Sequence, residues 1–108
     1  DEFAQKAMHC RRMVHELLSD WYGYLSAKAI YVDQWSEVEW WEQRVPRDLS
    51  ALCRMMTQEE WWQSPTDFRT VCQTLWAIHT SAEKVDESPD TNRLYELIVA
   101  LEETKRDE

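Results

Sequence analysis

Cysteine and histidine, the residue types that most often do chemistry, come together at few points in this chain. Cys72 and His79 share one face of a predicted helix, but about 10 Å of helical rise separates them. That separation is too large for a nucleophile and its general base. Acidic pairs such as Glu59-Glu60 and Glu102-Glu103 are typical of solvated helix starts and ends. No glycine-rich loop accompanies them, so they do not indicate a catalytic site. The sequence therefore predicts no catalytic site.

Metal binding is also poorly supported by the spacing of candidate ligands. His9, Cys10 and His15 lack the i, i+4 spacing of a helical metal pair. His79 and Glu83 have that spacing but no third ligand nearby in the sequence. We expect His9 and His15 at the surface or facing a partner, His79 as a partly buried core residue, and neither a metal ion nor a cofactor.

Two basic residues of the first helix have the spacing that small helical mutases use to hold a dicarboxylate. These are Arg11 and Lys28. Glu39 and the acidic surroundings argue against such a site, because they would repel a dianionic substrate. The sequence thus predicts a protein that is not an enzyme.

Aromatic residues give a stronger signal, because the chain holds seven tryptophans among 108 residues. Two similar stretches, EWWEQRVPRDLSALC (39–53) and EWWQSPTDFRTVC (60–72), each contain an adjacent Trp-Trp pair. They reflect either a local duplication or two uses of the same helix-start pattern. Neighbouring residues on a helix point about 100° apart, so one ring of each pair is expected in the core and the other at its rim.

A core of this size is too small for every tryptophan, and each buried ring removes roughly 150 to 250 Å² from water. Exposed rings would promote aggregation unless a partner covered them. The alternative is a monomer in which all seven are core or rim residues. We predict a partner-binding surface, because aromatic residues dominate interface hot spots. The candidates are Trp21, Tyr22, Tyr24, Trp35, Trp40, Trp41, Trp61 and Trp62.

The elements that must position these rings are helices. Residues 1 to 32 predict one long helix, because apolar residues recur in steps of four and three, with Lys28 completing the row: Phe3, Ala7, Cys10, Val14, Leu17, Trp21, Tyr24 and Tyr31. Its length suggests that part of it extends beyond the bundle. This segment carries no net charge and its seam resembles a heptad, which favours self-association through Cys10, Val14 and Leu17. Gly23 indicates a kink, a close approach of another backbone, or merely a tolerated glycine.

Further helix starts are predicted from capping residues and prolines. Ser36 opens a short helix that Pro46 ends or interrupts, and residues 46–56 form the next helix. Thr57 and Glu60 repeat the capping-box spacing, and Ser64-Pro65 begins a helix over 65–85. Its predicted buried stripe is Phe68, Val71, Cys72, Leu75, Ile78, His79 and Ala82. Ser88-Pro89 opens the last helix, with Leu94, Leu97, Ile98 and Leu101 facing inward.

Length and composition agree with a single all-α domain, a compact bundle of four to five helices over residues 1–108. One glycine and three prolines are too few for the turns of a β-sandwich or barrel. The net charge of −9 disfavours direct binding to nucleic acid or anionic lipid. Three cysteines without a CxxC pair suggest free thiols in a reducing cytoplasm. Neither a membrane span nor a secretory leader is expected.

The stretch HCRRMVHELLSDWYGYLSAKAIYVDQWSEVEWW (9–41), together with the size, acidity and helix order of the chain, resembles a small helical quorum-sensing antiactivator. That resemblance implies a cytoplasmic protein that binds a LuxR-type transcription regulator and blocks its dimerisation or DNA binding. It also implies stoichiometric masking without a cofactor, and it is compatible with a homodimer.

An acidic mimic of nucleic acid, such as a phage-type inhibitor that fills a basic groove, is the alternative function. The two hypotheses differ in the residues that carry binding. A masking protein binds through aromatic and apolar side chains and tolerates salt, whereas a mimic loses affinity steeply as the salt concentration rises.

Overall fold

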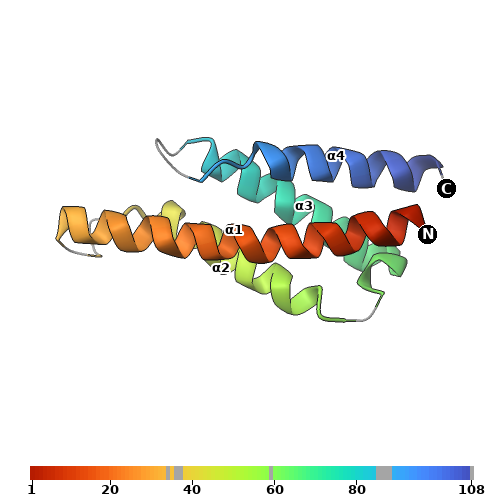
Figure 1. Cartoon of the computed structure of the whole chain (residues 1–108), viewed down its shortest axis with the longest axis horizontal. Helices are drawn as coiled ribbons and strands as arrows, with labels where there is room; N and C mark the ends of the chain where they lie inside the picture. Colours follow the sequence, from red (N-terminus) through yellow and green to blue (C-terminus); the bar gives the residue numbers. More distant parts are fainter. Residues whose placement is uncertain (34, 36–37, 59, 85–88, 108) are drawn as a thin grey trace.

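The computed structural model describes residues 1–33, 35, 38–58, 60–84 and 89–107. These residues contain four α-helices and one short 3₁₀ helix, and no strand occurs among them. The elements are α1 (Glu2–Val32), α2 (Trp40–Met55), η2 (Trp61–Gln63), α3 (Pro65–Ala82) and α4 (Asn92–Asp107). The predicted all-α class and helix number are confirmed (Figure 1).

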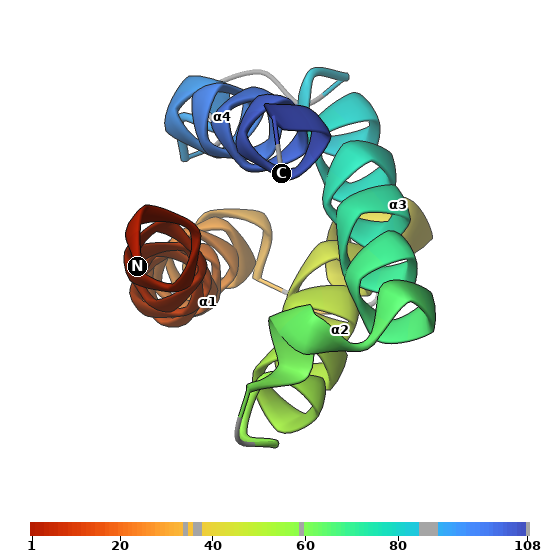
Figure 2. The same ribbon diagram turned by 90° about the vertical axis from the view of Figure 1, so that its right-hand side faces the viewer.

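The four α-helices alternate in direction and surround one core. In Figures 1 and 2, α1 lies beside α2 and α4, while α3 lies beside α2 and α4 on the other side of the core. The first and last described residues lie at the same end of the bundle (Figure 1). There the Lys6 ammonium donates a hydrogen bond of 2.8 Å to the Thr104 hydroxyl, which joins α1 to α4.

The long first helix is confirmed and extends beyond the other helices (Figure 1). The Asp1 carboxylate caps its start by accepting a hydrogen bond of 2.9 Å from the amide of Phe3. It ends at Asp33, whose φ of 66° places that residue in the left-handed region. At 1.5 Å per residue, 31 residues span about 46 Å. Ile30 and Tyr31 near its far end are 80% and 90% exposed.

Gly23 is a tolerated glycine within α1. It is exposed, its φ is not positive, and a Cβ added there would meet nothing within 4 Å. The close approach of another backbone that the sequence allowed is therefore absent. We expect Gly23→Ala to stabilise the fold by up to about 1 kcal/mol, because alanine loses less backbone entropy in a helix. Chemical denaturation would measure this, and a lower midpoint would contradict it.

Two predicted helices, one before Pro46 and one after it, are in fact the single helix α2. Pro46 lies inside α2 and is buried. It has no N–H to donate to the carbonyl of Glu42, so the helix loses one backbone hydrogen bond. Burial of Val45, Leu49 and Leu52 on the same helix holds it together across the proline. The prediction gave too much weight to the local effect of proline and too little to tertiary packing.

Some predicted helix starts are also corrected. Ser36 lies outside the described residues, and α2 begins after Glu39, whose side chain makes no capping hydrogen bond. The Thr57 hydroxyl donates backward to the Arg54 carbonyl at the end of α2, rather than capping the next helix. Glu60, with φ of 58°, precedes η2.

The proline start of α3 is confirmed, but that of α4 is wrong. The Ser64 hydroxyl accepts a hydrogen bond of 3.2 Å from the amide of Asp67. Helix α4 begins at Asn92, beyond Pro89, and the Asp90 carboxylate accepts from the amide of Asn92 at 2.9 Å. Helix α4 therefore starts beyond the predicted proline, where Asp90 bonds the amide of the first helical residue.

The apolar stripes meet in one core that all four α-helices share. All seven predicted stripe residues of α3 are buried, as are Leu94, Ile98 and Leu101 of α4, whereas Leu97 is half-buried. Cys10, Cys53 and Cys72 are free and buried. Burial raises the pKa of both the Cys10 and the Cys72 thiols to about 12, so both are protonated at neutral pH.

Candidate interaction surface

Histidine and cysteine side chains take structural roles. His79 is buried, with Nδ1 2.9 Å from the Thr91 hydroxyl and Nε2 3.0 Å from a carboxylate oxygen of Glu83. His9 and His15 are exposed, and Nδ1 of His15 lies 3.6 Å from the Cys53 sulfur. The described residues contain no group of three or more His, Cys, Asp or Glu placed to hold a metal ion.

Arg11 and Lys28, the residues that suggested a dicarboxylate site, bind groups of the chain itself. The Arg11 guanidinium donates to the Met56 carbonyl at 3.3 Å. The Lys28 ammonium donates to both carboxylate oxygens of Glu42, at 2.5 and 2.7 Å. They therefore do not converge on a shared anion site.

Trp21 and Trp61 belong to the core and not to a surface, which corrects their assignment as partner-binding residues. They are 0% and 2% exposed. Neither indole N–H has a hydrogen-bond partner. A buried donor without a partner costs roughly 1 to 3 kcal/mol, so these rings are held by packing alone.

Tyr24, Trp41 and Trp62 are half-buried, and Tyr24 and Trp62 pack against the core. Trp21 and Tyr24 pack edge to face with 5.3 Å between ring centroids, and Trp61 and Trp62 pack in the same manner at 5.9 Å. The expectation that one ring of each Trp-Trp pair enters the core therefore agrees with Trp61. In the other pair neither ring is a core residue, since Trp41 is half-buried and Trp40 is 64% exposed, so the expectation is wrong there.

Three of the predicted contact residues have rings that are more than half exposed. Trp40 is 64%, Tyr22 53% and Trp35 51% exposed. Tyr22 and Trp40 line one groove of about 640 Å³, formed where α1 lies against α2. A ring that is already exposed on a helix needs no rearrangement of the fold before it contacts a partner.

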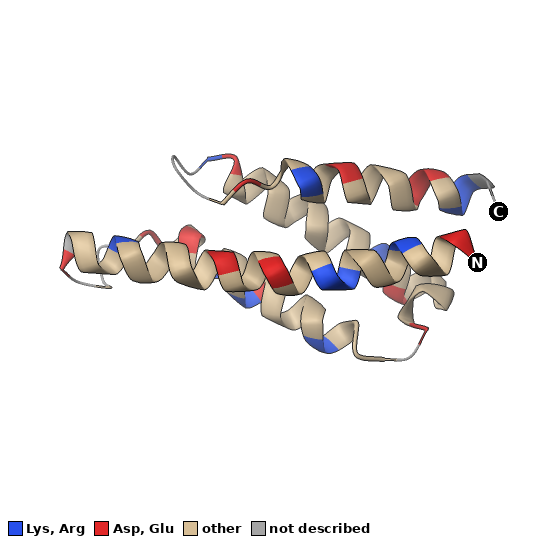
Figure 3. Cartoon of the chain, in the orientation of Figure 1, with Lys and Arg blue, Asp and Glu red and all other residues tan. Residues whose placement is uncertain are grey.

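Arginines form the rest of this surface, which we call the α1–α2 groove. It is lined by Tyr22, Trp40, Arg44, Arg47, Asp48, Ser50, Ala51 and Arg54. Arg44 stacks over Trp40, with its guanidinium carbon 5.5 Å from the ring centroid, and pairs with Asp48 at 3.7 Å. The groove therefore carries three positive charges and one negative charge, in a chain whose net charge is −9. Figure 3 shows the basic segments of α2 as blue bands.

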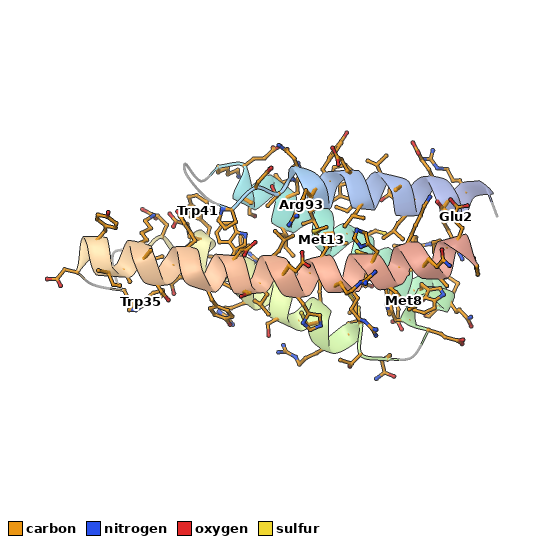
Figure 4. All side chains as sticks on the ribbon, viewed as in Figure 1. Glu2, Met8, Met13, Trp35, Trp41 and Arg93 are labelled. Carbon is orange, nitrogen blue, oxygen red and sulfur yellow. The ribbon has the colours of Figure 1, made fainter. Side chains whose placement is uncertain are left out.

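Trp35 lines a separate hollow at the far end of α1. That hollow, of about 350 Å³, is formed with Ser26, Ala29, Ile30 and Asp33. In Figure 4, Trp35 lies beside the same edge of α1 as Met8, whereas Trp41 is seen on the opposite side of that helix. The predicted contact residues are thus divided among the core, its rim and two surface hollows.

Cys10, Val14 and Leu17, the predicted self-association seam, face the core of the chain itself. They are 0%, 0% and 1% exposed. A heptad-like pattern is common to coiled-coil seams and to helices of antiparallel bundles, so the pattern alone did not distinguish the two. These residues are therefore not a surface for a second copy.

A buried ion pair fixes the position of α2 against the second half of α1. Glu42 is 3% exposed, and besides Lys28 it accepts a hydrogen bond of 3.3 Å from the Tyr24 hydroxyl. Hydrogen bonding to Glu42 raises the pKa of Lys28. Burial, followed by the negative charge of Glu42, raises the pKa of Tyr24. The cluster joins α1 to α2, the two helices that line the α1–α2 groove.

The chain matches no protein-family model, no curated protein and no solved structure. Among the described helices, none is long and apolar enough to cross a bilayer.

The three arginines of the groove and the buried Glu42 were missed in the sequence. Their signals were present: Trp40, Arg44, Arg47 and Arg54 repeat at steps of four, three and seven, which places them on one helical face. Glu42 lies three residues before Val45 and seven before Leu49, on the apolar face of the same helix. Placing a helix boundary at Pro46 hid both patterns.

Proposed function

We propose that this chain is a protein-binding inhibitor without enzymatic activity, which acts by masking a surface of its partner. In line with the resemblance of residues 9–41, the proposed partner is a LuxR-type transcription regulator whose dimerisation or DNA binding is blocked. The observation that carries the proposal is the pair of exposed rings, Trp40 and Tyr22, across one groove between two packed helices. Trp, Tyr and Arg are the residue types enriched at interface hot spots.

Energetics support a role in binding for these rings. Trp40 and Tyr22 together leave a substantial apolar area in water, and covering such area contributes about 25 cal/mol per Å². Helices joined by the buried Lys28–Glu42 pair hold the rings in place before a partner arrives. Preorganisation of this kind lowers the entropy cost of association.

The acidic-mimic alternative is less well supported by the groove. A mimic of nucleic acid needs a continuous acidic face, whereas three of the eight residues that line the α1–α2 groove are arginines. The net charge of −9 remains available to keep the protein soluble and to limit unspecific contacts.

The proposal predicts that Trp40→Ala weakens partner binding by about 2 kcal/mol, or roughly thirtyfold, because a central aromatic contact is lost. The partner would be captured from cell lysate by the immobilised protein, identified by mass spectrometry and then titrated in purified form. Tyr95→Ala is the matched control, since Tyr95 is a partly exposed ring on α4.

The acidic-mimic alternative predicts the opposite pattern in the same titration. Glu39→Gln, at an exposed position beside Trp40, would then weaken binding in a salt-dependent manner while Trp40→Ala bound like the parent. That result would reject masking through the aromatic rings.

A homodimer and a cytoplasmic location also belong to this proposal. Three buried free thiols suit a reducing compartment. Because Cys10, Val14 and Leu17 are core residues, a second copy would need other surfaces, such as the exposed Ile30 and Tyr31 near the end of α1.

A further inference from the structure

The exposed face of α2 presents a regular row of side chains along the α1–α2 groove. Trp40, Arg44, Arg47, Ala51 and Arg54 follow one another at steps of four, three, four and three, so they lie on one face over about 21 Å. The smallest side chain, Ala51, lies between Arg47 and Arg54. Tyr22 of α1 lines the same groove from its other wall.

Two of these arginines have no ionic partner among the described residues. Arg44 pairs with Asp48 and stacks on Trp40, but Arg47 makes no ion pair with any described carboxylate. Arg54 donates only to the Ser50 hydroxyl, at 3.1 Å. Both are exposed. In a chain with 21 acidic and 12 basic residues, two unpaired arginines beside exposed rings form a local positive field of the sign opposite to that of the whole protein.

We propose that the α1–α2 groove binds an acidic amphipathic helix of the partner protein. This inference rests on the proposed function, that the chain binds a protein, and it adds the chemistry of the bound segment. Carboxylates of that helix pair with Arg47 and Arg54, because the planar guanidinium donates two parallel hydrogen bonds to a carboxylate. Apolar side chains of the same helix, one turn after another, enter the space above Ala51 and pack against Tyr22 and Trp40.

A helix fits this groove better than an extended strand does. The row on α2 repeats every three to four residues, so a helix lying along it brings side chains at i, i+4 and i+7 opposite successive arginines. The described chain has no strand and hence no open sheet edge to which an extended peptide could add. The ionic contribution should make binding moderately sensitive to salt, in proportion to two ion pairs.

The test uses a fluorescein-labelled, alanine-based helical peptide whose row of leucines is flanked by glutamates. Fluorescence anisotropy with the full chain should show binding that exceeds that of a scrambled peptide of the same composition. Arg47→Glu combined with Arg54→Glu should weaken binding of the acidic peptide about tenfold or more. Because these substitutions reverse the charge of the groove, the double variant should instead prefer a peptide with lysines in place of the glutamates.

Matched controls separate the effect of the charges in the α1–α2 groove from the effect of the net charge of the protein. Arg12→Glu combined with Arg106→Glu changes the total charge by the same amount at exposed sites on α1 and α4, and it should leave peptide affinity within about twofold. Circular dichroism would verify that every variant remains helical. Equal losses in both double variants, or binding of the scrambled peptide as tight as that of the designed one, would overturn the inference.

A labelled single-stranded DNA 20-mer tests whether the arginines select phosphates instead. Tighter binding of this probe than of the acidic peptide, lost in the Arg47→Glu, Arg54→Glu variant, would also overturn the inference. Failure of the proposed function has a different signature, because the parent chain would then capture no partner from lysate although the peptide still bound. If the parent captures its partner and the peptide does not bind, only the present inference fails.

Discussion

Replacing Val14 and Leu17 together by glutamate is expected to abolish the folded state. Both side chains are at most 1% exposed and lie where α1 meets the shared core. An unpaired buried carboxylate costs several kcal/mol even after the structure relaxes, and the lost apolar burial adds about 2 kcal/mol or more for each site. Domains of this kind have a total stability of about 5 to 15 kcal/mol, so two such changes should exceed what the fold tolerates.

Circular dichroism at 222 nm should show the loss of helical signal and of any cooperative melting transition. Ser19→Glu with Ser26→Glu adds the same charge to exposed positions of α1 and should leave the melting curve nearly unchanged. A folded, monomeric Val14→Glu, Leu17→Glu protein would show instead that these residues form a dimer interface.

Removing Lys28 is expected to have the second-largest effect, because it leaves the Glu42 carboxylate buried without its cation. Breaking a fully buried pair costs about 3 to 5 kcal/mol, but the Lys28 side chain is 29% exposed, so solvent reduces this figure. We expect Lys28→Met to lower the free energy of unfolding by about 2 kcal/mol, and the melting temperature by about 10 °C. Differential scanning calorimetry would measure both.

Two variants control for the charge and the geometry of this pair. Lys6→Met removes a lysine that pairs with the mostly exposed Glu2 and donates to the Thr104 hydroxyl, and it should cost about 1 kcal/mol or less. Adding Glu42→Gln to Lys28→Met should recover part of the lost stability, since the buried charge is then gone. No recovery in the double variant would mean that the loss came from packing of the lysine stem.

The contact of Lys28 and Tyr24 with Glu42 also predicts how the stability of the fold changes at alkaline pH. The pKa of Lys28 is raised above its ordinary value of 10.5 in the folded protein, and that of Tyr24 above 10.0. Both groups therefore bind more protons when folded than when unfolded in this range. Their contribution to the free energy of unfolding is fully present below about pH 10, and it is lost as the pH rises through the raised pKa values of the two groups in the folded protein. Lys28→Met should flatten this loss.

The sequence predicted the parts of the fold that depend on long periodic patterns. Helix α1 and the buried face of α3 follow directly from apolar residues at helical spacing. The break within α2 and the start of α4 were wrong for a shared reason: proline was treated as a boundary, although packing around Pro46 keeps α2 intact and α4 begins at Asn92, beyond Pro89. Local rules failed where tertiary burial or a neighbouring side chain supplied the missing energy.

The candidate surface was only partly predictable. Composition indicated that not every tryptophan could be buried, and Trp40 and Tyr22 are exposed as a partner-binding role requires. Which rings enter the core depends on the rotation of each helix about its axis, and that rotation is set by contacts between helices. Trp21 and Trp61 were misassigned for this reason, and the arginine row became visible only once α2 was continuous across Pro46.

Anchoring of α1 is uneven along its length, which divides the helix into parts of different local stability. Beyond Lys28, no described side chain of α1 forms a hydrogen bond or ion pair with another helix, and Ile30 and Tyr31 are almost fully in water. The last turns can therefore open without unfolding the core, at a fraction of the global free energy, and the Lys28–Glu42 pair marks where such an opening stops. A partner that touched those turns would bind more tightly to the ordered form and suppress their opening. Binding at that end would thus be coupled to local order, with no change in the rest of the bundle.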